Sequence, residues 1–116
     1  MSKKGDFFKA INGKRLRVMN REYKVRVADI IREGNLYGLT SHVKERIDIS
    51  RSQSLHSARD TLLHEVMHAI WHTECMEYGI RGEDAEEYLV TAMSSGIMAV
   101  TENNPWLVEV LWNREI

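Results

Sequence analysis

Three of the five histidines in this 116-residue chain lie within one short segment, TLLHEVMHAIWHTE. It contains the pattern HEVMH, in which His64 and His68 are four residues apart. On a helix, residues at that spacing project from the same side one turn apart, so two imidazoles could share one zinc ion. Glu65 lies about 100° around the helix from His64, where its carboxylate could accept a proton from a metal-bound water. The segment therefore predicts two metal ligands and one general base.

The residues around HEVMH make this pattern more specific than the five letters alone. On a helical projection His64, Glu65, His68 and His72 form one polar stripe, and the apolar residues fall on the other side. Those apolar residues are Leu62, Leu63, Val66, Met67 and Ile70. The alternative is an amphipathic helix whose histidines merely face solvent, but such a face usually carries several Lys, Arg and Glu residues. The pattern therefore favours a site over a solvated surface.

His72 continues the same stripe one turn beyond His68. His72 and His64 are eight residues apart, roughly 12 Å along a helix axis, which is too far for both to join His68 on one zinc ion. We expect His72 either to lie behind the ligands or face the substrate, or to interact with the end of the helix.

A catalytic zinc needs a third protein ligand, which we expect from the next helix, EDAEEYLVTAMSSGIMAV. Taking Glu86 as 0°, Val90, Met93 and Ile97 fall within about 40° of it. Glu86 is therefore predicted to lie in the buried stripe of that helix, where a metal would offset its charge. Glu87, near 100°, and Glu83, in the first turn, remain alternatives. So does the possibility that all of these acids are simply charges at a helix N-terminus.

Composition and charge fit one domain spanning residues 1–116. The net charge of −1 argues against a general nucleic-acid-binding protein, so no nucleic-acid partner is expected. The single cysteine, Cys75, excludes an internal disulfide and suits a reducing compartment. Neither a signal peptide nor a run of about 18 apolar residues is present, so we expect a cytoplasmic protein without a membrane partner.

The order of the elements predicts an α+β fold, with strands first and helices after. Alternating residues predict a hairpin at 15–27 and a second strand pair at 35–50, with a possible short helix at 28–35 between them. The predicted helices are 55–72, with Ser52 or Ser54 as its N-cap, 83–101, and a short closing helix that begins at Asn104 and Pro105.

Between about residues 36 and 112, the chain resembles the gluzincin metallopeptidases, and more narrowly the small ImmA/IrrE-like and phage-encoded metallopeptidases. The resemblance rests on GLTSHVKERIDIS, RDTLLHEVMHAIWH, EEYLVTAM and ENNPWLVEVL. It implies a minimal zincin-like fold, an N-terminal antiparallel β-meander followed by the HExxH helix, a second long helix and a short C-terminal helix. It also implies a Zn²⁺ cofactor on His64 and His68, with Glu65 as base and Glu86 or Glu87 as third ligand.

The resemblance leads us to expect a zinc-dependent metallopeptidase, a cytoplasmic hydrolase that cuts one particular protein, such as a regulator. The strand at ERIDIS would be an edge for an extended peptide, and the oxyanion partner could be His42, His72, Tyr78 or Tyr88. The alternative is a zinc-containing module of the same fold that binds a partner protein with little turnover. A metal-dependent hydrolase acting on nucleic acid is a third hypothesis, which the near-neutral charge disfavours.

Overall fold

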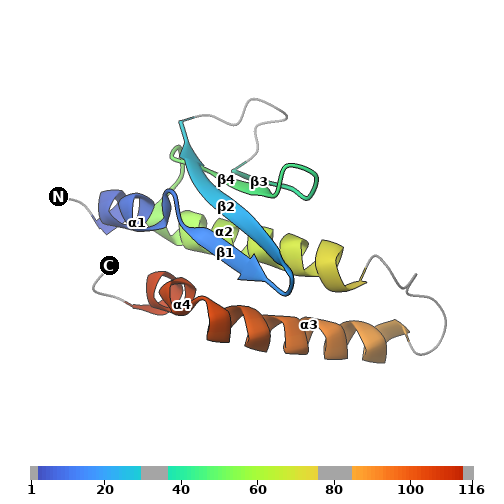
Figure 1. Cartoon of the computed structure of the whole chain (residues 1–116). Coiled ribbons are helices and arrows are strands. Elements are labelled where there is room, and N and C mark those ends of the chain that lie inside the picture. Colours follow the sequence, from blue (N-terminus) through green and yellow to red (C-terminus); the bar gives the residue numbers. More distant parts are fainter. Residues whose placement is uncertain (1–2, 30–36, 76–84, 114–116) are drawn as a thin grey trace.

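The described part of the chain forms a four-stranded sheet with helices packed against one of its faces. A computed structural model describes residues 3–29, 37–75 and 85–113. The elements, in order, are α1 (Lys3–Ile11), β1 (Arg15–Val18), β2 (Arg21–Ala28), β3 (Gly38–Ser41), β4 (Arg46–Ser50), α2 (Leu55–Ile70), the π-helical turn η1 (Trp71–Cys75), α3 (Ala85–Asn103) and α4 (Pro105–Trp112). Figure 1 shows α2 running behind the strands, with α3 and α4 below it. The α+β class predicted from the sequence is confirmed.

The core lies between the sheet and the helices. Exposed and buried residues alternate along β1 and through the middle of β2, so one face of the sheet is apolar and the other is polar. The apolar face contributes Leu16, Val18, Tyr23, Val25, Val27, Ile47 and Ile49. Leu62, Val66 and Ile70 of α2 are buried in the same core, as the helical projection predicted.

The predicted antiparallel meander is wrong, because the sheet is mixed. Its strand order is β1-β2-β4-β3, and β2 and β4 run parallel with Val25 opposite Ile47. After β2 the chain crosses to the outer edge, forms β3 there and returns as β4 in an antiparallel pair with β3. The physical reason is burial: residues 47–50 of β4 are all buried, as in a central strand. The expectation that ERIDIS forms an edge is therefore wrong, and the edge next to α2 is β3.

Helix α1 was not predicted from the sequence. It buries Phe7, Phe8 and Ile11 and ends before Gly13, which has a positive φ of 84°. The side-chain oxygen of Asn12 accepts a hydrogen bond from the amide of Val27 at 2.9 Å, which fixes this helix to β2. The predicted short helix at 28–35 lies largely outside the described residues.

The helix that carries HEVMH begins where the sequence indicates. Ser54 is its N-cap, with its hydroxyl accepting a hydrogen bond from the amide of Ser57 at 3.1 Å. The α-helix ends at Ile70, and the chain continues as the π-helical turn η1 through His72. None of the described helices combines the length and apolar character needed to cross a lipid bilayer.

The closing helix also begins as predicted, at Pro105, but Asn104 does not cap it with its side chain. That side chain pairs instead with β1, accepting from the amide of Arg17 at 2.9 Å and donating to its carbonyl at 2.8 Å. Asn104 therefore joins the corner between α3 and α4 to the sheet.

Candidate metal site

His64 and His68 lie next to each other on the exposed side of α2. Their Nε2 atoms are 3.1 Å apart, and the two rings meet edge to face with centroids 4.8 Å apart. Two zinc–nitrogen bonds of about 2.0–2.1 Å at a tetrahedral angle would place the nitrogens about 3.4 Å apart. The pair therefore fits a metal ion after a shift of a few tenths of an ångström.

Glu65 lies on a different side of the helix from these histidines. It is only 6% exposed, and β3 covers it. The hydroxyl of Thr40 donates to its Oε1 at 2.8 Å and also lies 3.1 Å from its backbone carbonyl oxygen. The sequence predicted that Glu65 would share one exposed polar stripe with the histidines, and that prediction is wrong. The reason is the edge strand, whose position beside α2 a helical projection does not show.

The close approach of β3 to α2 depends on Gly38. A Cβ atom at this position would lie 2.5 Å from Thr61 Cγ2 and 2.9 Å from Glu65 Cγ, which is closer than packed carbon atoms come. Only glycine lets the strand pack this tightly on the carboxylate. Gly38 and Thr40 thus hold the side chain of Glu65 in place from the same strand.

A cavity of about 520 Å³ opens between α2, η1 and α3 on the side of the histidines. Its lining residues are His64, Met67, His68, Trp71, Leu89 and Met93. The two imidazoles are its polar members, and the others are apolar. Trp71 forms one of its walls. The histidine pair is therefore part of a hollow that could accept an apolar group.

The carboxylates of α3 are exposed, and the predicted buried stripe is wrong in phase. Glu86 and Glu87 are both exposed, as are Val90 at 56% and Ile97 at 37%. The side of α3 that faces the protein is formed instead by Leu89, Met93, Gly96 and Val100. On a helical projection, the mean direction of these four residues is about 50° from Glu86 and about 150° from Glu87.

Of the two glutamates, Glu86 is thus nearer the cavity side, one turn before Leu89. Within residues 3–29, 37–75 and 85–113, however, no third His, Cys, Asp or Glu groups with the histidine pair to hold a metal. Glu86 as third ligand stays a prediction, and Glu83 lies outside the described residues.

The remaining histidine of the predicted stripe, His72, stacks on His42 from the turn between β3 and β4. The two rings are 5.2 Å apart and inclined by 25°. The Nδ1 atom of His42 also lies 2.5 Å from the hydroxyl oxygen of Tyr23, which is fully buried. His42 and His72 were each considered from the sequence, but their contact was not predicted, because no local pattern relates a strand turn to a helix end 30 residues later.

Comparison with known protein families, curated proteins and solved structures finds no match to this chain.

Proposed function

We propose that this protein is a zinc-dependent metallopeptidase that cuts a particular protein substrate. The observation that carries the proposal is the pair of imidazoles 3.1 Å apart at an apolar cavity, with a buried carboxylate on the residue next to His64. Two histidines and one glutamate on a single helix supply two metal ligands and a general base. The single cysteine fits a reducing compartment such as the cytoplasm.

In this proposal, His64 and His68 hold the metal and Glu65 moves the proton. Zinc, when bound, supplies a Lewis acid that activates water and polarises a peptide carbonyl. The carboxylate of Glu65 accepts the proton of the attacking water and delivers it to the amine that leaves. The hydroxyl of Thr40 supports this role, because its hydrogen bond to Oε1 restricts the carboxylate to one orientation.

The third ligand in this proposal is Glu86, which on a helical projection is nearer than Glu87 to the cavity side of α3 and lies one turn before Leu89. Its carboxylate is exposed in the described structure. Metal binding would therefore have to draw the first turn of α3 toward α2. Glu87 lies on the far side of the helix and is the natural control.

Two features support a peptide as substrate. Strand β3 is an edge of the described sheet, and no described strand pairs with its outer side, where an extended peptide could add. The cavity beside the histidines is lined mainly by Met67, Trp71, Leu89 and Met93, which suits a large apolar side chain next to the bond that is cut.

The test of this proposal is zinc-dependent cleavage of a mixed peptide library, with products mapped by mass spectrometry. The wild-type protein loaded with zinc should cut beside apolar residues, and a chelator should stop the reaction. Glu65→Gln should keep zinc but lose cleavage, because the amide cannot accept the proton. Cleavage at an unchanged rate in Glu65→Gln would rule out the general-base role.

The burial of Glu65 favours a second candidate function, a zinc-containing module that binds a partner protein with little turnover. A base that is 6% exposed and hydrogen-bonded to Thr40 has limited access to water. In that case the wild type and Glu65→Gln would bind the same partner equally, and neither would cut it. Affinity capture of partners with both proteins, followed by analysis of the captured chains for cuts, separates the two functions.

A further inference from the structure

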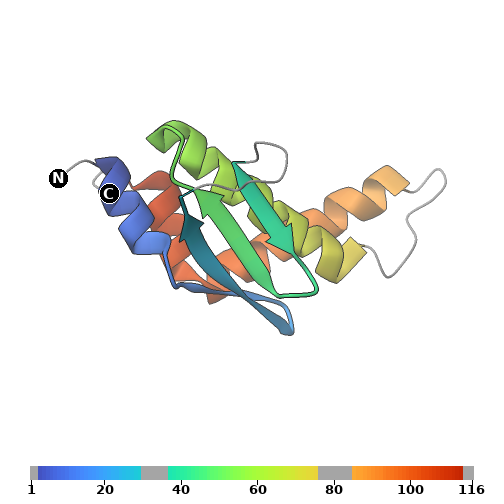
Figure 2. The same cartoon turned by 90° about the horizontal axis from the view of Figure 1, so that it is seen from above.

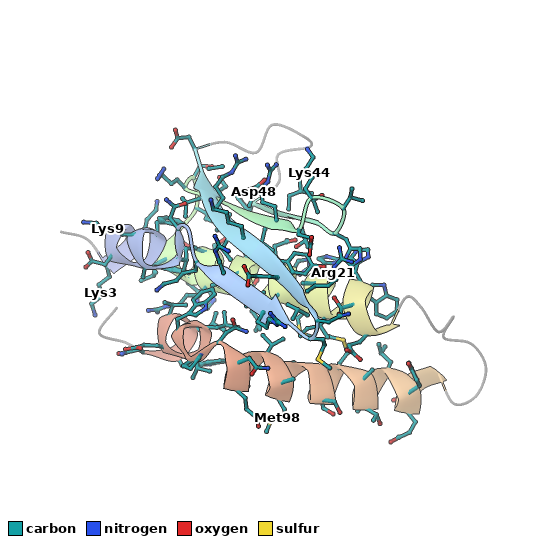
Figure 3. The ribbon with its side chains drawn as sticks, viewed as in Figure 1. Lys3, Lys9, Arg21, Lys44, Asp48 and Met98 are labelled. Carbon is teal, nitrogen blue, oxygen red and sulfur yellow. The ribbon has the colours of Figure 1, made fainter. Side chains whose placement is uncertain are left out.

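The second feature that calls for a function is the outer face of the sheet. In β1 and β2 every second residue is exposed, and in Figure 2 the strands lie in front of α2 and α3, with no described helix over that face. Five cations occupy it, which we call the cationic face: Arg15, Arg17, Lys24, Arg26 and Arg46. Asp48 is also on this side, above the strands and away from α3 in Figure 3.

The cations of this face are placed directly beside one another. Arg15 of β1 is the cross-strand partner of Lys24 in β2, and Lys24 is in turn the partner of Arg46 in β4. Like charges at directly opposed positions destabilise a sheet, so a row of three disfavours folding. The neighbouring rows pair opposite charges, Arg17 with Glu22 and Arg26 with Asp48, so this row is the part of the face where the signs do not alternate.

Two acidic side chains offset part of this charge. Glu22 lies 3.0 Å from Arg15, and the two oxygens of Asp48 lie 3.1 Å from Arg26 and 3.2 Å from Arg46. Lys24, which is exposed, has no ion pair among the described residues. The cationic face therefore keeps a net positive charge.

The near-neutral total charge hides a strong separation along the chain. Residues 1–51 hold 13 Lys and Arg against 6 Asp and Glu, whereas residues 52–116 hold 3 against 11. Over distances longer than about 8–10 Å, charges are screened at physiological salt. A ligand at the sheet therefore responds to the local cations more than to the net charge of −1.

We propose that the cationic face docks an extended, acidic segment of a partner protein. Residues two apart on a strand repeat about every 6.6–6.8 Å, and an extended peptide repeats its side chains at the same interval. Asp or Glu at every second position of the peptide would therefore have the same spacing as Arg15 and Arg17, or as Lys24 and Arg26. Asp48 shows that guanidinium groups of this face already converge on a carboxylate.

Nucleic acid fits the face less well. The four strands contain one aromatic residue, Tyr23, and it is fully buried in the core, so bases find no ring to stack on. Glu22 and Asp48 would also face the phosphates. The inference does not depend on the peptidase proposal, because it uses none of the residues of the zinc site.

Fluorescence anisotropy with a labelled peptide of alternating Asp and Ser tests the docking directly. The wild-type protein should bind the peptide at about 0.05 M salt and release it at about 0.5 M, where screening is stronger. Arg15→Glu/Lys24→Glu should weaken binding about tenfold or more. The matched control is Lys4→Glu/Lys9→Glu, which makes the same charge change on exposed residues of α1 and should keep most of the affinity.

The single variant Lys24→Glu provides a second test. Lys24 has no ion pair among the described contacts, so its replacement leaves the ion pairs of Arg15, Arg26 and Arg46 intact. Circular dichroism melts confirm that each variant is folded. Three results would overturn the inference: equal losses in the sheet and α1 variants, tighter binding of a short DNA duplex than of the acidic peptide at the same salt, or loss of peptide binding on adding a chelator. The last would place the carboxylates on a metal instead of on the sheet.

Discussion

Near the proposed site, the two flanks of α2 are packed differently. On one flank β3 approaches so closely that position 38 has no room for a Cβ atom, and Glu65 is held by Thr40. On the other flank α3 leaves a cavity of about 520 Å³ beside His64 and His68, and its glutamates face solvent. The side chain of Glu65 is therefore positioned by the fold, whereas Glu86 could join the histidines only if the first turn of α3 moved toward α2.

The largest expected effect breaks the tight flank. Gly38→Ala should lower the free energy of unfolding by about 3 kcal/mol, because the added methyl group meets Thr61 and Glu65 and forces the strand away. Denaturant unfolding followed by circular dichroism measures this change.

The control for Gly38→Ala is Gly96→Ala on the α3 flank. Its Cβ would meet the side chain of Ile70 at 2.5 Å, but a helical alanine also gains about 1 kcal/mol over glycine, so the net loss should be clearly smaller. Equal losses in the two variants would show that the helix propensity of alanine does not offset its contact with Ile70.

A smaller effect is expected from the hydrogen bond on the same tight flank. Thr40→Val keeps the shape of the side chain but removes the donor to the buried carboxylate, which should cost about 2 kcal/mol of stability. Thr40→Ser keeps the hydroxyl and should retain most of the stability. If thermal or denaturant melts show that Thr40→Val is as stable as Thr40→Ser, then the hydroxyl of Thr40 does not hold Glu65.

The smallest expected effect concerns zinc binding on the α3 flank. Glu86→Gln should weaken zinc binding about tenfold, or about 1.4 kcal/mol, and Glu87→Gln should leave the affinity unchanged. The reason is the direction of each side chain on α3, since Glu86 is on the side of Leu89 and Met93. Competition titrations against a zinc indicator measure both affinities. A loss of zinc affinity in Glu87→Gln alone would show that α3 directs Glu87, and not Glu86, toward the histidines.

The same difference between flanks explains what could be predicted from the sequence. Local periodicity was enough for both strand pairs, for α2 with its Ser54 cap and for the adjacent imidazoles, because each depends on residues close in the chain. The parallel pairing of β2 with β4 and the cover of β3 over Glu65 depend on where distant segments meet, which periodicity does not show. The phase of α3 was predicted wrongly because Val90 and Ile97 were assumed to be buried, whereas both are exposed.

Helix α1 was missed for a related reason. Its first residues are charged and polar, and its buried face is a short group formed by Phe7, Phe8 and Ile11. A helix of nine residues offers too few turns for a clear period of 3.6. Its stability comes from contacts with the sheet and α2, which no local pattern records.

The most direct test of the central claim is the zinc content of the purified chain, measured by native mass spectrometry. We expect one zinc ion per wild-type chain and per Glu65→Gln chain, released by a chelator, and none in His64→Ala or His68→Ala, because each histidine supplies half of the pair that is 3.1 Å apart. A wild-type chain that takes up no zinc, or a His64→Ala chain that still holds one, would contradict the claim that this helix is a metal site.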